Sequence, residues 1–181
     1  MKIVQIGGSR QGVGKTSLGC ALIGALPQYR WMALKISPHG HVAGAAGLLR
    51  EECSIDSDKD TSRYLAAGAR RAWLAEGDVP LDFWQARSGE EGVLVVESNR
   101  RIGQGIVPCA FLAVCDGGRD TWKASFAERW SDADVLALTG GAEFAGLREE
   151  RFEGEIARLG AGTWISDSLV AAVARLLESN R

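Results

Sequence analysis

Residues 2–16 have the sequence KIVQIGGSRQGVGKT, in which a short apolar run leads into a glycine-rich segment and then a lysine-threonine pair. Residues 2–6 have the apolar pattern of a β-strand, and residues 15–26 carry apolar side chains at helical spacing. A glycine-rich turn between a strand and a helix is the usual context of a phosphate-binding loop. The segment therefore predicts a P-loop nucleotide site within an α/β domain.

Each part of this segment has a chemical reason. Gly12 and Gly14 allow successive backbone N–H groups to point at phosphate oxygens, and the following helix adds its partial positive charge. Lys15 is expected to bind the β- and γ-phosphates, and Thr16 to bind Mg²⁺ through its hydroxyl. Ser9 stands where the G-x-x-x-x-G-K-[ST] pattern has its first glycine. The alternative is a glycine-rich turn followed by a surface lysine. The expected nucleotide contacts are Ser9, Arg10, Gln11, Gly12, Val13, Gly14, Lys15, Thr16 and Ser17.

The rest of the chain alternates between strand and helix patterns. We expect strands at 31–36, 72–75, 93–97, 110–114 and 135–138, and helices at 61–68, 120–130, 143–159 and 166–178, the last capped by Ser166 or Ser168. Residues 42–59 look irregular or briefly helical, and residues 79–86 are ambiguous. This alternation predicts one α/β domain over 1–181, with a doubly wound, mostly parallel sheet and helices on both faces.

Composition excludes several classes of protein. The 181 residues are 46% hydrophobic and 24% charged, with a net charge of −2, which argues against disorder and against electrostatic binding of nucleic acid. The four cysteines show no C-x-x-C spacing, so neither a zinc site nor a redox pair is expected. No signal-peptide pattern or run long enough for a membrane span is found, so we expect a cytoplasmic protein.

Glycine is in excess, with 23 residues. Gly7, Gly8, Gly12 and Gly14 gather at the phosphate loop. Two other groups, in the segments 44–47 and 103–105, follow expected strand ends, where we expect a surface that a ligand orders.

Glu97 is the expected second half of the nucleotide site. It ends the run Val93-Leu94-Val95-Val96-Glu97, which reads as a parallel strand buried on both faces. If that strand neighbours the first, Glu97 lies beside the phosphate loop, where it can hold Mg²⁺ through water or orient an attacking water. Lys15 and Glu97 are thus the candidate catalytic residues, and Thr16 and Glu97 the candidate metal ligands. The alternative for Glu97 is a strand-end carboxylate in solvent.

Other candidate residues follow expected strand ends. Lys35 contacts phosphate or substrate, or is a solvated strand end. We expect Asp60 to cap a helix beginning near Thr61, and a further role for it is to reach the Mg²⁺ shell. Arg100 neutralises phosphate charge, or solvates its loop. His39 and His41 without a third ligand make a poor zinc site, and we expect them in a lid over the ligand.

Four blocks in this order resemble the molybdopterin-guanine dinucleotide biosynthesis protein B (MobB) family. They are the phosphate loop, Lys35 with His39 and His41, the segment 56–61 leading to Ala67-Gly68-Ala69, and the segment 93–100. That family has a strand ending in lysine-histidine, a G-K-D-[ST] segment opening a helix that ends in A-G-A, and a strand ending in E-G-[FY]-[KR]. The resemblance covers about residues 1–115. This chain departs from the family at Pro38, at Asp58 and at Ser98-Asn99.

The resemblance implies a dimeric GTP-binding adaptor with weak GTPase activity, using Mg²⁺. Such a protein works beside a nucleotidyltransferase or molybdopterin-handling protein in molybdenum cofactor biosynthesis. Alternatives are an ATP-dependent small-molecule kinase, a dethiobiotin synthetase-like ligase, a ParA-like ATPase whose signature lysine would fall at Arg10, and a scaffold with a vestigial site. The residues do not distinguish GTP from ATP, because Thr139-Gly140-Gly141 replaces the N-K-x-D motif that reads guanine.

Overall fold

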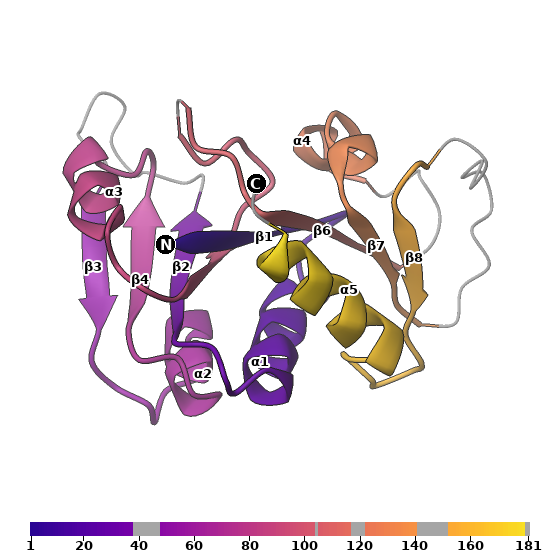
Figure 1. Ribbon diagram of the computed structural model, residues 1–181, viewed down its shortest axis with the longest axis horizontal. Coiled ribbons are helices and arrows are strands. Elements are labelled where there is room, and N and C mark those ends of the chain that lie inside the picture. The colour runs from indigo at the N-terminus through magenta and orange to yellow at the C-terminus, as the bar shows by residue number, and fades with distance from the viewer. Residues whose placement is uncertain (38–47, 104, 117–121, 141–151, 180–181) are drawn as a thin grey trace.

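A computed structural model describes residues 1–37, 48–103, 105–116, 122–140 and 152–179 (Figure 1). One eight-stranded sheet runs through the molecule in the order β3-β4-β2-β5-β1-β6-β7-β8. Every neighbouring pair is parallel except the antiparallel pair of β3 and β4. The predicted doubly wound, mostly parallel sheet is confirmed. The strands are β1 (Lys2–Gly8), β2 (Trp31–Ser37), β3 (Leu48–Glu52), β4 (Ala72–Glu76), β5 (Val93–Glu97), β6 (Ala110–Cys115), β7 (Val135–Leu138) and β8 (Glu155–Arg158).

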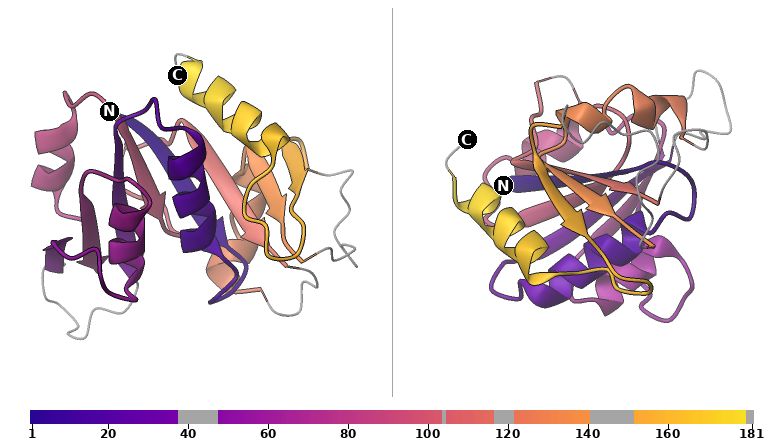
Figure 2. Two further views of the ribbon diagram at one scale, coloured as in Figure 1. Left: turned by 90° about the horizontal axis from the view of Figure 1, so that it is seen from below. Right: turned by 90° about the vertical axis from the view of Figure 1, so that its right-hand side faces the viewer.

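Helices cover both faces of the sheet, as two turned views make clear (Figure 2). The helices α1, α2 and α5 pack on one face, and α3 and α4 cover the other. The described helices are α1 (Lys15–Ala25), α2 (Asp60–Ala66), α3 (Leu81–Arg87), α4 (Ala124–Ala127), the 3₁₀ turn η2 (Trp130–Asp132) and α5 (Asp167–Glu178).

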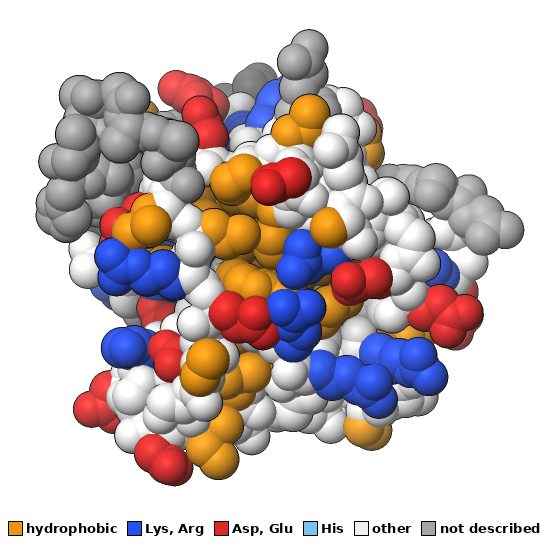
Figure 3. Space-filling model, turned by 90° about the vertical axis from the view of Figure 1, so that its left-hand side faces the viewer, with side chains coloured by type: hydrophobic (Ala, Val, Ile, Leu, Met, Phe, Trp, Pro, Cys, Tyr) orange, Lys and Arg blue, Asp and Glu red, His pale blue; other side chains and the backbone are white. Residues whose placement is uncertain are grey.

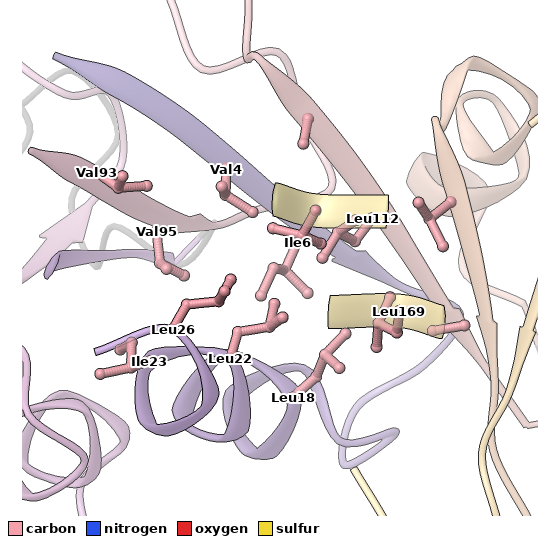
Figure 4. Packing of buried hydrophobic residues seen from close by; sticks show 14 of the residues in the cluster. Val4, Ile6, Leu18, Leu22, Ile23, Leu26, Val93, Val95, Leu112 and Leu169 are labelled. Atoms are coloured by element: carbon pink, nitrogen blue, oxygen red, sulfur yellow. The ribbon is translucent and has the colours of Figure 1, made fainter. Parts of the chain in front are cut away.

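The largest hydrophobic cluster lies between the central strands and α1 (Figure 4). Leu18 and Leu22 of α1 point toward Val4 and Ile6 of β1, and Leu169 of α5 joins them from the side. Alternate residues of the same strands, such as Ile3, face the other cluster, because successive strand side chains point to opposite faces. Burial on both faces explains why β1, β5 and β6 read as continuous apolar runs.

Two segments have a secondary structure other than the one expected, and both are edge strands. Residues 48–52, expected to be irregular or briefly helical, form β3, whose Leu48 pairs with Glu76 of β4. Residues 155–158, expected to be helical, form β8 parallel to β7. Residues 143–151 of that expected helix lie outside the described residues. Edge strands are half-solvated and rich in charge, so pairing with a neighbour decides their structure rather than an apolar run.

The expected helix over 120–130 is only partly present. It is reduced to α4 and η2. Trp122, Phe126 and Trp130, which are spaced four residues apart, pack together, with the Trp122 ring centroid 5.0 Å from that of Phe126 and 5.6 Å from that of Trp130. Ser166 caps α5 as expected, because its hydroxyl accepts a hydrogen bond from the Leu169 N–H.

The β3 edge is protected by charge. Figure 3 looks onto this side of the molecule, where basic and acidic side chains lie around a hydrophobic area. Arg71 donates two hydrogen bonds of 2.7 Å to Glu51 of β3, and its guanidinium lies 4.7 Å from the centre of the Trp73 ring. Charged side chains on an edge strand discourage pairing with another sheet.

Candidate functional site

The glycine-rich segment forms a loop between the carboxyl end of β1 and the start of α1, as predicted. β1 lies between β5 and β6 at the centre of the sheet. Gly12 has a φ of +72° and Gly14 a φ of +101°, conformations that L-residues rarely adopt. The carbonyl of Gly14 accepts the first helical hydrogen bond, from Leu18 at 2.8 Å. The loop therefore has the curvature and the helix N-terminus that a phosphate site requires.

Ser9 is accommodated at the place of the first glycine. The structure has no positive φ at any described residue other than glycine, so this position does not require glycine. Ser9 is fully buried, and its hydroxyl donates to Asp116 Oδ1 at 3.3 Å. Arg10 forms an ion pair with the same carboxylate. Asp116, the residue that follows β6, thus holds the first turn of the loop through both side chains.

Asn99 holds the opposite side of this turn. Its Oδ1 accepts from the Gly8 N–H at 2.7 Å, and its Nδ2 donates to the Gly8 carbonyl at 3.0 Å. The side-chain amide thereby satisfies both backbone groups of Gly8, as a neighbouring strand would. This contact gives a structural role to Asn99, one of the positions at which the chain departs from the MobB pattern.

Trp164 packs against the end of the loop. A Cβ built on Gly14 would lie 1.8 Å from Cζ3 of the Trp164 ring. Two independent reasons therefore require glycine at position 14: its φ is positive, and the indole occupies the space that a side chain would need. Trp164 lies in the segment between β8 and α5, 150 residues along the chain from Gly14, and sequence reasoning did not connect the two.

Glu97 is buried at the centre of the site. β5 is the neighbour of β1, and the Glu97 side chain is 6% exposed. Its Oε2 accepts a hydrogen bond from the Thr16 hydroxyl at 2.7 Å. Its Oε1 lies 3.7 Å from Nζ of Lys15 and 3.7 Å from Nζ of Lys35. The alternative of a solvated strand-end carboxylate is wrong.

Lys35 and Asp60 complete a cluster of opposite charges around Glu97. Lys35, near the end of β2, is paired with Asp60, the first residue of α2. Burial lowers the pKa of Lys35, but the carboxylates of Glu97 and Asp60 outweigh it and raise this pKa overall. Burial raises the pKa of Asp60, but hydrogen bonds with Lys35 and Thr16 lower it overall. Burial lowers the pKa of Lys15 despite the attraction of Glu97.

Asp60 does not cap its helix as expected. The N-cap position of α2 is Lys59, which makes no side-chain capping bond. The Asp60 side chain turns toward Lys35 and Thr16 instead. Lys35 is likewise not a solvated strand end, since only 26% of its side chain is exposed.

Tyr64 is a residue of the site that sequence reasoning missed. It is fully buried in α2, and its hydroxyl donates to Glu97 Oε2 at 3.2 Å. Burial, and then the charge of Glu97, raise the pKa of Tyr64 well above its ordinary value, so the hydroxyl stays a donor. A Cβ on Gly19 would lie 2.7 Å from the Tyr64 ring. A glycine inside α1, which weakens a helix, was the available signal.

The remaining predicted residues have different surroundings. Gln11 is exposed beside the loop, while Val13 is 2% exposed and packs into the main core. The Ser17 hydroxyl accepts a hydrogen bond from Arg63 at 2.9 Å. Arg100 is exposed in the loop after β5. His39 and His41 lie outside the described residues.

A pocket of about 1000 Å³ opens beside the phosphate loop. It begins at Gln11 and Lys15, passes Lys35 and Glu97, and reaches α3 and the loop after β5. The carboxyl ends of parallel strands meet at this edge of the sheet, which is where open α/β sheets bind ligands. The pocket thus adjoins the loop on the side of Lys15, the residue expected to reach the terminal phosphates.

No protein-family model and no curated protein matches this chain. Among solved structures it is similar to HypB from Helicobacter pylori, solved in complex with nickel, with a TM-score of 0.53 at 10% identity, covering 96% of this chain and 84% of that one. It is also similar to the hydrogenase maturation factor HypB from Archaeoglobus fulgidus, with a TM-score of 0.53 at 12% identity, covering 98% and 91%. With its sheet order and phosphate loop, the chain has the α/β fold of the P-loop NTPases.

None of the described helices is both long enough and apolar enough to cross a membrane.

Proposed function

We propose that this protein binds a nucleoside triphosphate with Mg²⁺ at the loop formed by residues 8–16. The observation that carries the proposal is the position of Glu97, which is buried within 2.7 Å of the Thr16 hydroxyl and 3.7 Å from the Lys15 ammonium. A glycine-rich turn without a ligand role has no need for a buried carboxylate beside its lysine, because burying charge costs free energy. A nucleotide site uses the Lys15 ammonium, the Thr16 hydroxyl and the Glu97 carboxylate together.

Each group has a defined task in this proposal. Backbone N–H groups around Gly12 and Gly14 bind the phosphate oxygens, and Lys15 neutralises the β- and γ-phosphates. Glu97 holds Thr16 and Lys15 in place and orients a water molecule toward the terminal phosphate. We expect slow hydrolysis, because the MobB family that the sequence resembles has weak GTPase activity.

The donor set fits Mg²⁺. The ion prefers oxygen ligands and is usually bound by one or two carboxylates together with substrate phosphates and water. Thr16 and Glu97 supply a hydroxyl and a carboxylate in contact, and Asp60 lies beside the same hydroxyl. Among the described residues no three His, Cys, Asp or Glu side chains form a metal cluster, which suits an ion that arrives with the nucleotide. Bound Mg²⁺ supplies positive charge to the phosphates.

At a finer level we propose a GTP-binding adaptor of the MobB type, acting as a homodimer beside a nucleotidyltransferase or another molybdopterin-handling protein in the cytoplasm. Three separate blocks of the sequence resemblance contribute Lys35, Asp60 and Glu97, which lie in one cluster next to Lys15 and Thr16. Blocks that are distant in sequence but adjacent in space support a shared site rather than chance similarity.

A second candidate function is an ATP-dependent small-molecule kinase or ligase. The observation that favours it is the pocket of about 1000 Å³ beside Lys15, which has room for an acceptor molecule. A ParA-like ATPase is less well supported. Arg10, at the position of the ParA signature lysine, is paired with Asp116 of its own chain.

Calorimetric titration with GTP and with ATP, each with and without Mg²⁺, tests the proposal. We expect Mg²⁺-dependent binding that Lys15→Ala abolishes and that Lys2→Ala, a matched change at the opposite end of β1, leaves intact. A GTP preference with slow turnover supports the adaptor, and ATP turnover stimulated by a small molecule supports the kinase. No binding of either nucleotide at millimolar concentration refutes the proposed function.

A further inference from the structure

The pocket beside the phosphate loop has its own chemical character. Its wall carries five cationic side chains and two carboxylates, together with several large apolar residues. Only Gln11 and Lys15 come from the phosphate loop itself. Most of the pocket therefore lies beyond the region that a nucleotide's phosphates would fill, and its volume is at the upper end of small-molecule sites.

Three of the pocket's cations have no anionic partner within the described residues. Lys15 and Lys35 are neutralised by Glu97 and Asp60. By contrast, Arg100, Arg101 and Lys123 form no ion pair with any described side chain, although they line the same pocket. Unpaired cations held around one pocket favour an anionic ligand.

The outer wall of the pocket is apolar and partly aromatic. Trp84 of α3 and Ile102 are 8% and 4% exposed, and both belong to the hydrophobic cluster on this face of the sheet. Leu81, at the start of α3, is 67% exposed and lines the same pocket. A wall that combines an indole with aliphatic side chains suits the flat apolar body of an organic molecule.

The Trp84 indole has an unused donor. Its Nε1 is buried and finds no hydrogen-bond acceptor among the described residues. The backbone of Gly103 closes over it, since a Cβ there would lie 3.6 Å from Nε1. Buried indole N–H groups normally have a partner, so this unpaired donor marks the pocket wall as a place that a ligand acceptor would complete.

Glycines shape the loop that carries these residues. Gly105 has a φ of +76° and Gly103 a φ of +155°, and a Cβ at Gly103 would lie 3.0 Å from Cδ1 of Ile106. Gly103 therefore allows Ile106 to fold back onto the pocket wall. We expected two further glycine groups, in the segments 44–47 and 103–105, at a ligand surface. The first lies outside the described residues, and Gly103 and Gly105 of the second lie within them.

We propose that this pocket binds a second ligand, an organic anion with a flat apolar body. Arg100, Arg101 and Lys123 bind its acidic group, and its body lies against Trp84 and Ile102. Binding of this second ligand to the pocket does not require nucleotide. Its position next to a terminal phosphate rests on the proposed function. Because Lys15 and Glu97 line both sites, occupancy of one changes the affinity of the other.

The probe for this proposal is anilinonaphthalene sulfonate, an aromatic anion whose fluorescence rises in apolar surroundings, titrated into the nucleotide-free protein. We expect saturable binding at one site per chain. Arg100→Gln/Arg101→Gln should weaken it at least about tenfold, equivalent to about 1.4 kcal/mol. Arg30→Gln, at an exposed ion pair outside the pocket, is the matched control and should leave the affinity unchanged.

Two further measurements separate charge from shape and separate this proposal from the nucleotide site. Neutral phenylnaphthylamine should bind more weakly than the sulfonate and respond little to the arginine changes, while Trp84→Phe should weaken both probes. Equal affinity of the sulfonate for wild type and the double arginine variant overturns the proposal. Sulfonate binding that depends on these arginines, in a protein that binds no nucleotide, supports the pocket and refutes the proposed function alone.

Discussion

Replacing Tyr64 with phenylalanine tests whether the buried charge cluster is held from α2. The change removes only the hydroxyl that donates to Glu97 at 3.2 Å, and it keeps the ring that Gly19 accommodates. A hydrogen bond to a charged group contributes about 1.5–3 kcal/mol. We expect Tyr64→Phe to lower the free energy of unfolding by that amount. In a protein of this length the corresponding fall in Tm is about 3–12 °C.

Tyr29→Phe is the matched control. The Tyr29 ring makes an edge contact with Trp31, with 6.0 Å between centroids, but its hydroxyl has no hydrogen bond with the described residues. The same chemical change there should alter stability by less than about 0.5 kcal/mol. Urea unfolding followed by circular dichroism measures both variants. Equal stabilities for Tyr64→Phe and Tyr29→Phe would refute the reasoning that the hydroxyl stabilises Glu97.

Two further predictions concern the loop and the ion pair. Gly12→Ala, with open space around its Cβ, should cost about 1–2 kcal/mol of backbone strain, while Gly14→Ala should cost about 1–3 kcal/mol more through its clash with Trp164. In urea unfolding, adding Trp164→Ala to Gly14→Ala should remove the extra cost of the Gly14 substitution. Equal losses of stability for Gly12→Ala and Gly14→Ala would contradict the clash with Trp164. The lowered pKa of Asp60 gives stability above its ordinary value of 3.8 that is lost as pH falls through the lowered value. The raised pKa of Lys35 gives stability below 10.5 that is lost as pH rises through the raised value. The free energy of unfolding of Asp60→Asn should therefore lie below that of wild type mainly between about pH 4 and 10. A difference in this free energy that is the same at every pH would count against the Lys35–Asp60 ion pair.

Local patterns predicted the centre of the site. The strand, glycine-rich turn and helix around Lys15 are adjacent in sequence, and the buried run ending at Glu97 identifies a central strand by its composition alone. Parallel strands place their carboxyl ends at one edge, so the proximity of Glu97 to Thr16 followed from topology. Lys35 was predicted at that edge for the same reason, although its pairing with Asp60 was not predicted.

The rest of the site depends on contacts between distant segments. Tyr64 reaches Glu97 across 33 positions of sequence, and Asn99 reaches Gly8 across 91. A buried tyrosine on a short helix has the same local pattern whether it packs or donates a hydrogen bond. Trp164 carries no motif at all. The edge strands β3 and β8 were missed because their charged residues resemble a loop or a solvated helix until a neighbouring strand pairs with them.

The charge balance of the site connects the phosphate loop with the larger pocket. Lys15 and Lys35 are matched by Glu97 and Asp60, so this buried cluster is already neutral within itself. A Mg²⁺–triphosphate complex is still an anion, and it would bring unmatched negative charge next to that cluster. Removing one member of a buried pair is costly, so the cluster cannot release a lysine freely. In the proposed function Lys15 contacts the phosphates while it stays beside Glu97, and the additional positive charge comes from pocket cations without an ion pair among the described residues, namely Arg100, Arg101 and Lys123. If both proposals hold, nucleotide and second ligand compete for, or share, these three cations. The sign of the coupling between them, measured as the change in sulfonate affinity on adding Mg²⁺ and nucleotide, distinguishes these two arrangements.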